Sequence, residues 1–164
     1  MSSGVEIREI GADGFARAWP IFREVIAGGD TYSYAPDLGE QEACAMWTSP
    51  PSRCFVAERG GVVLGLYMLR PNQPGLGDHV ANCGYMVAPH ARGQGIASMM
   101  CGHSLDEARR AGFHAMQYNF VVSSNQGAVR LWQRHGFAIV GRVPAAFRHA
   151  RLGLVDVCVM HRAL

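Results

Sequence analysis

The sequence contains no lysine, because all fifteen of its basic residues are arginines. A chain without lysine offers no side-chain amine for Schiff-base catalysis. No apolar run approaches the roughly 18 residues that a membrane span needs. The first residues, MSSGVEIREI, show neither the basic start nor the apolar core of a secretory signal. We therefore expect a cytoplasmic protein with no membrane partner.

Patterns for disulfides and metal sites are missing as well. The five cysteines are widely spaced without a C-x-x-C pair, and the seven histidines form no H-x-H or H-x-x-x-H cluster. We expect no disulfide framework and no metal, with the cysteines acting as small buried hydrophobes.

Hydrophobic residues make up 49% of the 164 positions and charged residues 17%. This composition predicts one folded domain over residues 1–164.

The net charge of +2 hides an asymmetry between the two halves of the chain. Residues 1–82 hold ten acids and six arginines (net −4), whereas residues 83–164 hold three acids and nine arginines (net +6). The basic half is a candidate for binding an anion. Its arginines are scattered, with no basic run and no interleaved aromatics, so nucleic acid is not favoured as a partner.

Hydrophobic periodicity and turn residues predict an α/β fold. We expect a mixed, mostly antiparallel sheet of about seven strands with helices on both faces. The predicted strands are, roughly, 5–10, 54–58, 62–70, 79–88, 115–122, 138–147 and 152–161. The predicted helices are 14–27 with Asp13 as its cap, 39–48, 95–111, and one from Ser124 or Asn125 to about 135. The acids Asp106 and Glu107 of the third helix are expected to face solvent.

The most informative segment follows the predicted strand 79–88, where a glycine-rich turn opens a helix. Unpaired backbone N–H groups and the positive end of the helix dipole make such a helix start an anion site. Gly93 and Gly95 allow a phosphate to approach the backbone closely, and Arg92 adds a charge that can bind two phosphate oxygens.

Three readings of this turn compete. A Walker loop fails because it requires lysine. A dinucleotide-binding loop is nearly matched by Gly93-Gln94-Gly95, but its third glycine and the acid after the next strand are missing. A strand-to-helix turn without a ligand is the remaining alternative.

Two motifs together resemble one family. Arg92-x-x-Gly95-x-Ala97 is similar to the Q/R-x-x-G-x-G/A pyrophosphate loop of the GNAT superfamily of acetyl-CoA-dependent N-acetyltransferases. Thirty residues later, the stretch from Asn125 to Phe137 resembles that family's N-x-x-A-x-x-L-Y-x-x-x-G-F helix. The resemblance covers nearly the whole chain, and its specific motifs lie between Tyr85 and Phe137.

The resemblance implies a binding site for acetyl-CoA as cosubstrate. The backbone edge of Tyr85, Met86 and Val87 would pair with the pantetheine arm, and Asn125 would hydrogen-bond near a pantetheine amide. The backbone N–H of Val87 would stabilise the oxyanion. The backbone amides that would surround the pyrophosphate belong to Arg92, Gly93, Gln94, Gly95, Ile96, Ala97 and Ser98.

One residue departs from the family pattern. Many members carry a tyrosine as the acid for the departing thiolate, and Trp132 stands at the matching position. An indole N–H is a much poorer acid than a phenol. A thiolate can leave near neutral pH, by analogy with the cysteine thiol, whose pKa is about 8.5. The absence of the tyrosine therefore does not exclude catalysis.

The acceptor side is indicated by two asparagines in otherwise apolar strands. A buried amide is costly without hydrogen bonds, so Asn82 and Asn119 should each have a definite partner. They are either substrate contacts or scaffold residues. With Asn125 they resemble a trio in a narrower branch that acts on proline analogues such as azetidine-2-carboxylate. In that branch one asparagine binds the substrate carboxyl and another orients the reacting group, so the resemblance implies substrate-binding and catalytic roles for Asn82 and Asn119. The GDTYSY loop and the VGRVP segment also resemble that branch, and Tyr32 and Tyr34 would wall the acceptor pocket.

The sequence thus predicts an acetyl-CoA-dependent N-acetyltransferase for a small, amino-acid-like amine. The general base is left open among Glu24, Asp30, Asp78, His79 and an ordered water. A protein or peptide acetyltransferase and a catalytically silent acyl-CoA-binding module are the alternatives. A homodimer is common in this architecture, although no feature of the sequence requires one.

Overall fold

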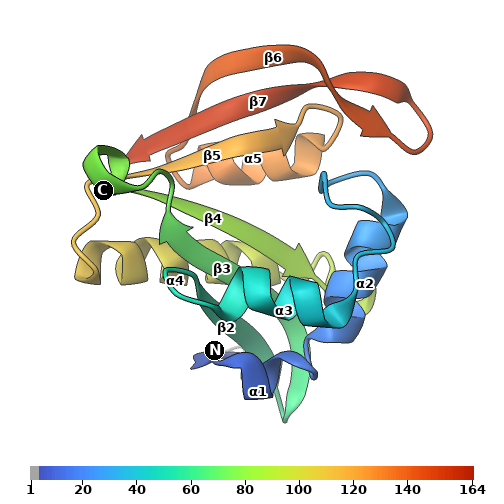
Figure 1. Cartoon of the computed structure of the whole chain (residues 1–164), viewed down its shortest axis with the longest axis vertical. Helices are drawn as coiled ribbons and strands as arrows, with labels where there is room; N and C mark the ends of the chain where they lie inside the picture. Colours follow the sequence, from blue (N-terminus) through green and yellow to red (C-terminus); the bar gives the residue numbers. More distant parts are fainter. Residues whose placement is uncertain (1–3) are drawn as a thin grey trace.

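The strands of residues 4–164, the part of the chain that the computed structural model describes, form one seven-stranded sheet (Figure 1). The order across the sheet is β1-β2-β3-β4-β5-β7-β6. The strands are β1 (Glu6–Ile10), β2 (Arg53–Arg59), β3 (Val62–Pro71), β4 (Val80–Val87), β5 (Ala115–Val122), β6 (Ala138–His149) and β7 (Gly153–Ala163). All neighbours are antiparallel except β4 and β5. The predicted mixed, mostly antiparallel sheet is confirmed.

Helices cover both faces of this sheet. The helices are α1 (Ala12–Phe15), α2 (Trp19–Gly28), α3 (Glu40–Thr48), α4 (Ile96–Arg110) and α5 (Gln126–Arg134). Single 3-10 turns at Gly75–Gly77 and Pro89–Ala91 flank β4. On one face α2 packs on β4 and α3 on β2. On the other face α4 packs on β3 and β4, and α5 joins it there because its Trp132 ring lies against Tyr85 and Tyr118.

The prediction of one continuous helix over residues 14–27 is wrong. Instead of one helix over 14–27 capped by Asp13, the chain forms α1, a turn, and then α2. Pro20 explains the break, since it has no N–H to donate and therefore fits only in the first turn of α2. Asp13 lies in the first turn of α1, and Gly11 is the N-cap. The predicted stop is confirmed, because Gly29 ends α2 in the left-handed region.

Strands β4 and β5 begin as a parallel pair and then separate. Their register covers only Val80↔Ala115 and Ala81↔Met116. Beyond this point β5 pairs on its other side with β7, and that pairing is interrupted between Tyr118 and Val121. An interruption of this kind bends a strand and changes the direction of its side chains. The result is a gap in the middle of the sheet between the later parts of β4 and β5.

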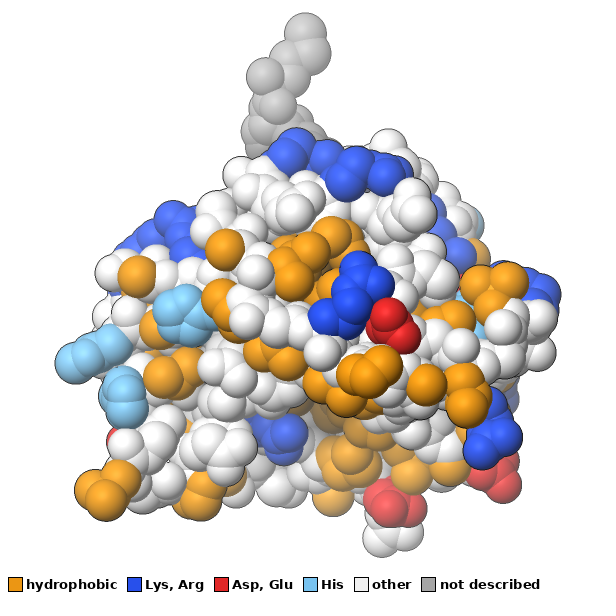
Figure 2. All heavy atoms as spheres, turned by 90° about the horizontal axis from the view of Figure 1, so that it is seen from above, with side chains coloured by type: hydrophobic (Ala, Val, Ile, Leu, Met, Phe, Trp, Pro, Cys, Tyr) orange, Lys and Arg blue, Asp and Glu red, His pale blue; other side chains and the backbone are white. Residues whose placement is uncertain are grey.

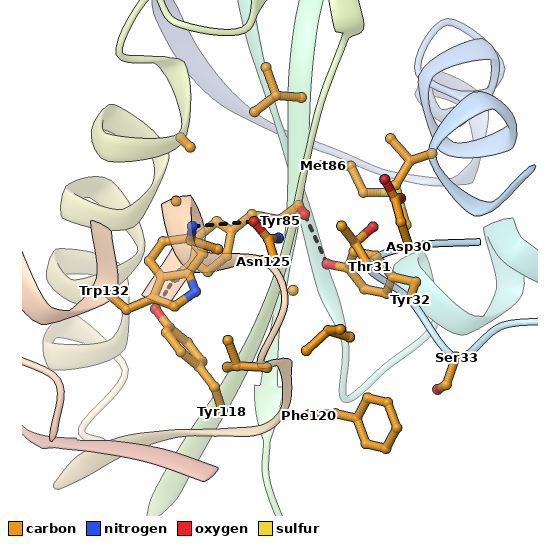
Figure 3. Close-up of a pocket in the computed structure, with 18 of the residues that line it drawn as sticks. Asp30, Thr31, Tyr32, Ser33, Tyr85, Met86, Tyr118, Phe120, Asn125 and Trp132 are labelled. Atoms are coloured by element: carbon orange, nitrogen blue, oxygen red, sulfur yellow. Dashed lines mark hydrogen bonds between the residues drawn. The ribbon is translucent and has the colours of Figure 1, made fainter. Parts of the chain in front are cut away.

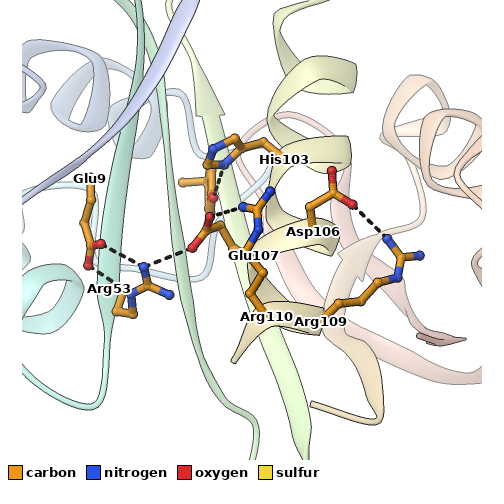
Figure 4. A network of polar contacts seen from close by, with 8 residues as sticks. Glu9, Arg53, His103, Asp106, Glu107, Arg109 and Arg110 are labelled. Carbon is orange, nitrogen blue, oxygen red and sulfur yellow. Dashed lines mark hydrogen bonds and ion pairs between the residues drawn. The ribbon is translucent and has the colours of Figure 1, made fainter. Parts of the chain in front are cut away.

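Helix α4 lies close to the sheet because of one glycine. A Cβ at Gly65 of β3 would come within 2.8 Å of the Met86 carbonyl oxygen and 2.9 Å of Met100 Cε. The absent side chain therefore leaves room for the helix. Ion pairs hold α4 at its far end, where Arg53 of β2 binds Glu9 of β1 at 2.8 Å and Glu107 of α4 at 3.0 Å (Figure 4).

The ion pairs of α4 correct one prediction about its charged face. The Glu107 side chain is only 15% exposed, since it lies between Arg53 and Arg110, so its predicted solvent-facing position is wrong. Asp106 is 59% exposed, as predicted, and pairs with Arg109. Arg53 lowers the pKa of Glu9 below its usual range through a hydrogen bond. The Arg53–Glu9 pair is therefore formed at neutral pH and weakens only when the pH falls low enough to protonate Glu9.

Four of the five cysteines are buried, as predicted, whereas Cys44 is only partly buried. Burial raises the pKa of the Cys54 and Cys83 thiols to about 12 and that of Cys101 to about 11. These thiols are therefore protonated at neutral pH and are poor nucleophiles. Within residues 4–164 we find no group of three or more His, Cys, Asp or Glu side chains arranged to hold a metal ion.

The β6–β7 end of the molecule exposes apolar side chains. Figure 2 looks down on this end and shows hydrophobic surface with scattered arginines and few acids. The exposed apolar residues of these strands and their turn are Ile139, Val140, Val143, Leu152 and Leu154. The predicted homodimer stays a prediction. No described helix is both long and apolar enough to cross a membrane.

Candidate active site

A cavity of about 760 Å³ lies at the gap between β4 and β5. Its lining comes from both faces of the sheet, so the gap connects them. Figure 3 shows Tyr32 and its neighbours in the α2–α3 loop on one side, and Trp132 with Tyr118 on the other. Tyr85 of β4 lies between these two groups, and the Met86 side chain lies beside Asp30 on the side of Tyr32. Two molecules that enter from opposite faces would meet in this gap.

The edge of β4 that faces the gap carries free backbone groups. Ala88 N–H donates to Leu64 O of β3 at 2.8 Å. Because backbone groups alternate along a strand, the N–H of Val87 points away from β3 and toward the gap. The Tyr85 carbonyl also points there and accepts a hydrogen bond of 2.9 Å from the Tyr32 hydroxyl. One lone pair of that carbonyl remains for a ligand.

The glycine-rich turn takes the predicted form at one end of the cavity. Gly93 and Gly95 have φ angles of +75° and +79°, and Gly95 is the N-cap of α4. The backbone N–H groups of the first helical turn have no acceptor within the helix. Arg92 lines the cavity and forms no ion pair among residues 4–164. The turn is thus a candidate anion site, with Arg92 beside it.

The side chains of this turn mostly serve the scaffold. Gln94 donates to His90 O at 3.1 Å, and Ile96 is buried in the core. Ser98 Oγ bonds His135 Nε2 at 2.8 Å, which links the start of α4 to the end of α5. At Gln94, Ile96 and Ser98 only the backbone N–H groups remain for a ligand, and that role stays a prediction.

Asn125 caps α5 as predicted. Its Oδ1 accepts from the Ala128 N–H at 3.3 Å, and the residue lines the cavity. Its Nδ2 amide has no hydrogen-bond partner within residues 4–164. The side chain is therefore able to cap the helix through oxygen and to donate to a ligand through nitrogen.

Trp132 is buried beside two tyrosines whose hydroxyls form a network. Its ring centroid lies 4.8 Å from that of Tyr85 and 5.2 Å from that of Tyr118. The Tyr85 hydroxyl bonds Tyr118 at 2.8 Å and Ser104 at 2.6 Å. Burial raises the pKa of both tyrosines well above 10. Both phenols thus stay protonated at neutral pH, and Trp132 packs against them from α5.

The two asparagines expected at the splayed strands do line the cavity, but their surroundings differ. Asn82 Nδ2 donates to Gln117 O at 2.9 Å and bridges β4 to β5 where the gap opens. Asn119 is exposed, contrary to the expected burial, and its Nδ2 donates to Asn72 Oδ1 at 2.6 Å. It is exposed because β5 is interrupted there. Each asparagine already has a partner in the protein.

The loop after α2 forms an ordered wall of the cavity. The Tyr32 and Tyr34 rings stack with centroids 5.4 Å apart, and Trp47 Nε1 donates to the Tyr34 hydroxyl at 3.1 Å. Burial raises the pKa of Tyr32 well above 10. The turn between β6 and β7 closes the wall, because Ala150 N–H donates to Gly29 O at 2.9 Å.

Several cavity residues escaped the sequence analysis. Of the four side chains considered as general base, Asp30 lines the cavity, whereas Glu24, Asp78 and His79 do not. The polar lining residues that no motif indicated include Arg70, His149 and Arg151. They come from two strand ends and a turn that carry no recognisable spacing. Thr31 also lines the cavity; it lies in the GDTYSY loop but was not singled out.

The structure therefore brings most of the predicted site together. The predicted residues that line the cavity are Tyr32, Tyr34, Asn82, Tyr85, Met86, Val87, Arg92, Ala97, Asn119 and Asn125. Those of the glycine-rich turn that do not line it are Gly93, Gln94, Gly95, Ile96 and Ser98. Their individual roles stay predictions.

Comparison with known proteins points to one family. The family model described as "Acetyltransferase (GNAT) family" matches residues 16–137. A GCN5-related N-acetyltransferase from Kribbella flavida is 41% identical, with a TM-score of 0.94 and 100% of both chains covered. The chain is also 35% identical over 98 residues to N-acetyltransferase aca1 of Schizosaccharomyces pombe, covering 59% of this chain and 47% of that protein.

A more distant structure shares the fold alone. It is yncA from Salmonella typhimurium, described as a putative acetyltransferase with its cofactor acetyl-CoA. It is 22% identical with a TM-score of 0.87, and the match covers 99% of this chain and 95% of that one. The chain spans about half the length of the curated relative aca1.

Proposed function

The chain belongs to the GNAT family of acetyltransferases, and from this premise we propose that residues 1–164 act as one domain that transfers the acetyl group of acetyl-CoA to a small amine. The observation that carries the proposal is the cavity at the gap between β4 and β5. It opens to both faces of the sheet and is bounded at one end by a glycine-rich helix start.

The cavity fits acetyl-CoA as a cosubstrate. Its pyrophosphate would bind the N-terminal turn of α4 from Gly93 to Ser98, with Arg92 as a counter-charge. The pantetheine arm would follow the free edge of β4 and accept a hydrogen bond from Asn125 Nδ2. The Val87 N–H would then face the thioester carbonyl, where the oxyanion develops.

The reaction needs no covalent enzyme intermediate. The neutral amine nitrogen attacks the thioester carbonyl carbon, a C–N bond forms, and the C–S bond breaks. The nitrogen loses one proton, and Asp30 is the proposed base because, of the four side chains considered, it alone lines the cavity. CoA leaves as a thiolate, which needs little protonation near neutral pH. Trp132 therefore does not prevent the reaction.

The acceptor enters from the face covered by α2 and α3. That side of the cavity has Tyr32, Tyr34, Asn82 and Asn119, which would position an amino-acid-like amine. The narrower part of the proposal is a proline analogue such as azetidine-2-carboxylate. The asparagine trio and the GDTYSY loop support it by resemblance.

A thiol-release assay tests the proposal. Acetyl-CoA is supplied with a panel of amino and imino acids, polyamines and basic peptides, while calorimetry follows acetyl-CoA binding. Release with a small amino or imino acid supports the proposal, and release with basic peptides alone favours a protein acetyltransferase. Binding of acetyl-CoA without release across the panel favours a silent acyl-CoA-binding module.

A further inference from the structure

Three arginines line the cavity, and none of them is paired within residues 4–164. They are Arg70, Arg92 and Arg151. The arginines that form ion pairs all lie elsewhere, at Arg8, Arg17, Arg53, Arg109, Arg110 and Arg142. A guanidinium carries five donors and stays charged, so the unpaired arginines of the cavity can bind an anionic ligand.

Two of these arginines lie away from the predicted pyrophosphate site. Arg70 is the cross-strand partner of Asn82, which lies five residues before Val87, or about 17 Å along β4. Its side chain shares a face with Asn82, the face covered by α2 and α3. Arg151 belongs to the turn that bonds Gly29 through Ala150. Both therefore lie on the acceptor side, whereas Arg92 lies at the start of α4.

A hydroxyl and a carboxylate also belong to the polar lining of this cavity. Thr31 Oγ1 is buried and is the one such side-chain oxygen or nitrogen within residues 4–164 without a hydrogen-bond partner. An unpaired buried hydroxyl is costly unless a ligand supplies the missing bond. Thr31 lines the cavity beside Asp30, which is the only acidic residue of the lining. The lining on the proposed acceptor side thus includes two arginines, the Thr31 hydroxyl and one carboxylate.

We propose that the acceptor is an anionic amine, an α-amino or imino acid, whose carboxylate is held by Arg70 and Arg151 while its nitrogen faces Asp30. This inference rests on the proposed acetyl transfer. The Thr31 hydroxyl donates to the same carboxylate. Two arginines beside one acid disfavour polyamines and basic peptides, so the clamp selects against the protein acetyltransferase alternative.

Matched pairs of acceptors test the clamp. L-Azetidine-2-carboxylate, L-proline, L-alanine and L-glutamate are each compared with their α-carboxamides in the thiol-release assay. The wild type should prefer every acid that it acetylates over the corresponding carboxamide. Arg70→Gln and Arg151→Gln should each raise KM for the acid roughly 10- to 100-fold, the range of a charge-assisted hydrogen bond. KM for the carboxamide should stay that of the wild type, and the affinity for acetyl-CoA should not change.

Two further variants separate specificity from folding. Arg148→Gln removes an exposed arginine of the same hairpin that does not line the cavity, and its KM should stay that of the wild type. Thr31→Val keeps the shape of the side chain and should raise KM for the acid without lowering the melting temperature. An unchanged KM for the acid in Thr31→Val would show that the hydroxyl does not contact the acceptor.

The outcomes distinguish this inference from the proposed function. Equal use of acid and carboxamide by the wild type, or weaker acetyl-CoA binding in the two arginine variants, would overturn the clamp and leave acetyl transfer intact. If no acceptor is acetylated, calorimetric titration of the same acids decides. Acid binding that disappears in the Arg70→Gln/Arg151→Gln double variant supports the clamp without turnover, and the absence of acid binding overturns it.

Discussion

Asn125 offers a prediction in which two roles of one side chain can be measured separately. Its Oδ1 caps α5 through the Ala128 N–H, and its Nδ2 is the predicted donor to the pantetheine arm. Asn125→Ala removes both. The lost cap should cost about 1 kcal/mol, which lowers the melting temperature of a chain of this length by about 2–4 °C. The lost hydrogen bond to the ligand, also worth about 1 kcal/mol, should lower the affinity for acetyl-CoA about fivefold.

Asn125→Asp separates the two effects. The carboxylate still accepts from the Ala128 N–H, and a negative charge at a helix N-terminus is favourable, so the melting temperature should match or exceed that of the wild type. The donor to the ligand is gone, and the new charge faces a polyanionic cosubstrate. Acetyl-CoA affinity should therefore fall at least as far as in Asn125→Ala.

Differential scanning calorimetry and isothermal titration of acetyl-CoA measure the two quantities on the same samples. Asn125→Asp with wild-type affinity would refute the ligand role and leave Asn125 as a cap alone. Asn125→Asp with the melting temperature of Asn125→Ala would refute the capping energy worked out above. The combination of unchanged stability and weakened binding is the result that the geometry requires.

Three further predictions concern the helix start, the thiolate and pH. Gly95→Trp should greatly weaken acetyl-CoA binding in a calorimetric titration. Gly112→Trp changes a glycine with a similar positive φ at the other end of α4 and should lower stability without changing this binding. Equal acetyl-CoA affinities of the two variants would refute the pyrophosphate site. Trp132→Tyr should leave kcat nearly unchanged, and a rise of about 100-fold, the usual contribution of a general acid, would contradict the view that the thiolate leaves unaided. Burial lowers the pKa of His103 and His135 below the ordinary value, so the unfolded chain binds more protons below about pH 6.5. Stability should be constant above that pH and fall below it, and His103→Gln should reduce the slope of melting temperature against pH; an unchanged slope would refute this origin.

Local sequence signals were sufficient for most of the fold, because strands and helix ends are determined by neighbouring residues. Asn125 at the cap of α5 and the hairpin at Gly60-Gly61 follow directly from turn and capping chemistry. The apolar periodicity over 14–27 predicts one continuous helix, because it runs across the break between α1 and α2. Pro20 is the sequence signal for that break, since it fits only in the first turn of a helix.

The acceptor side was harder to predict because its polar residues are assembled by tertiary contacts. Arg70 reaches the cavity through the β3–β4 register, and Arg151 through the bond between Ala150 and Gly29. Neither contact leaves a periodic or spaced pattern in the sequence. Asn119 shows the opposite error, since its apolar neighbours predicted burial, and the interruption of β5 exposes it.

The gap between β4 and β5 links the fold to the proposed chemistry, and it depends on features outside the predicted motifs. Asn82 bridges the two strands to Gln117 at the point where they part, so this residue supports the gap from inside. Tyr32 covers the Tyr85 carbonyl on the face of α2 and α3, and the bulky ring of Trp132 covers the opposite face. In the proposed reaction, acetyl-CoA and the amine would enter from opposite faces, and the amine would meet the thioester beside the Val87 N–H. The sheet would hold the position of the site, and the α2–α3 loop and the β6–β7 turn contribute lining residues on the proposed acceptor side.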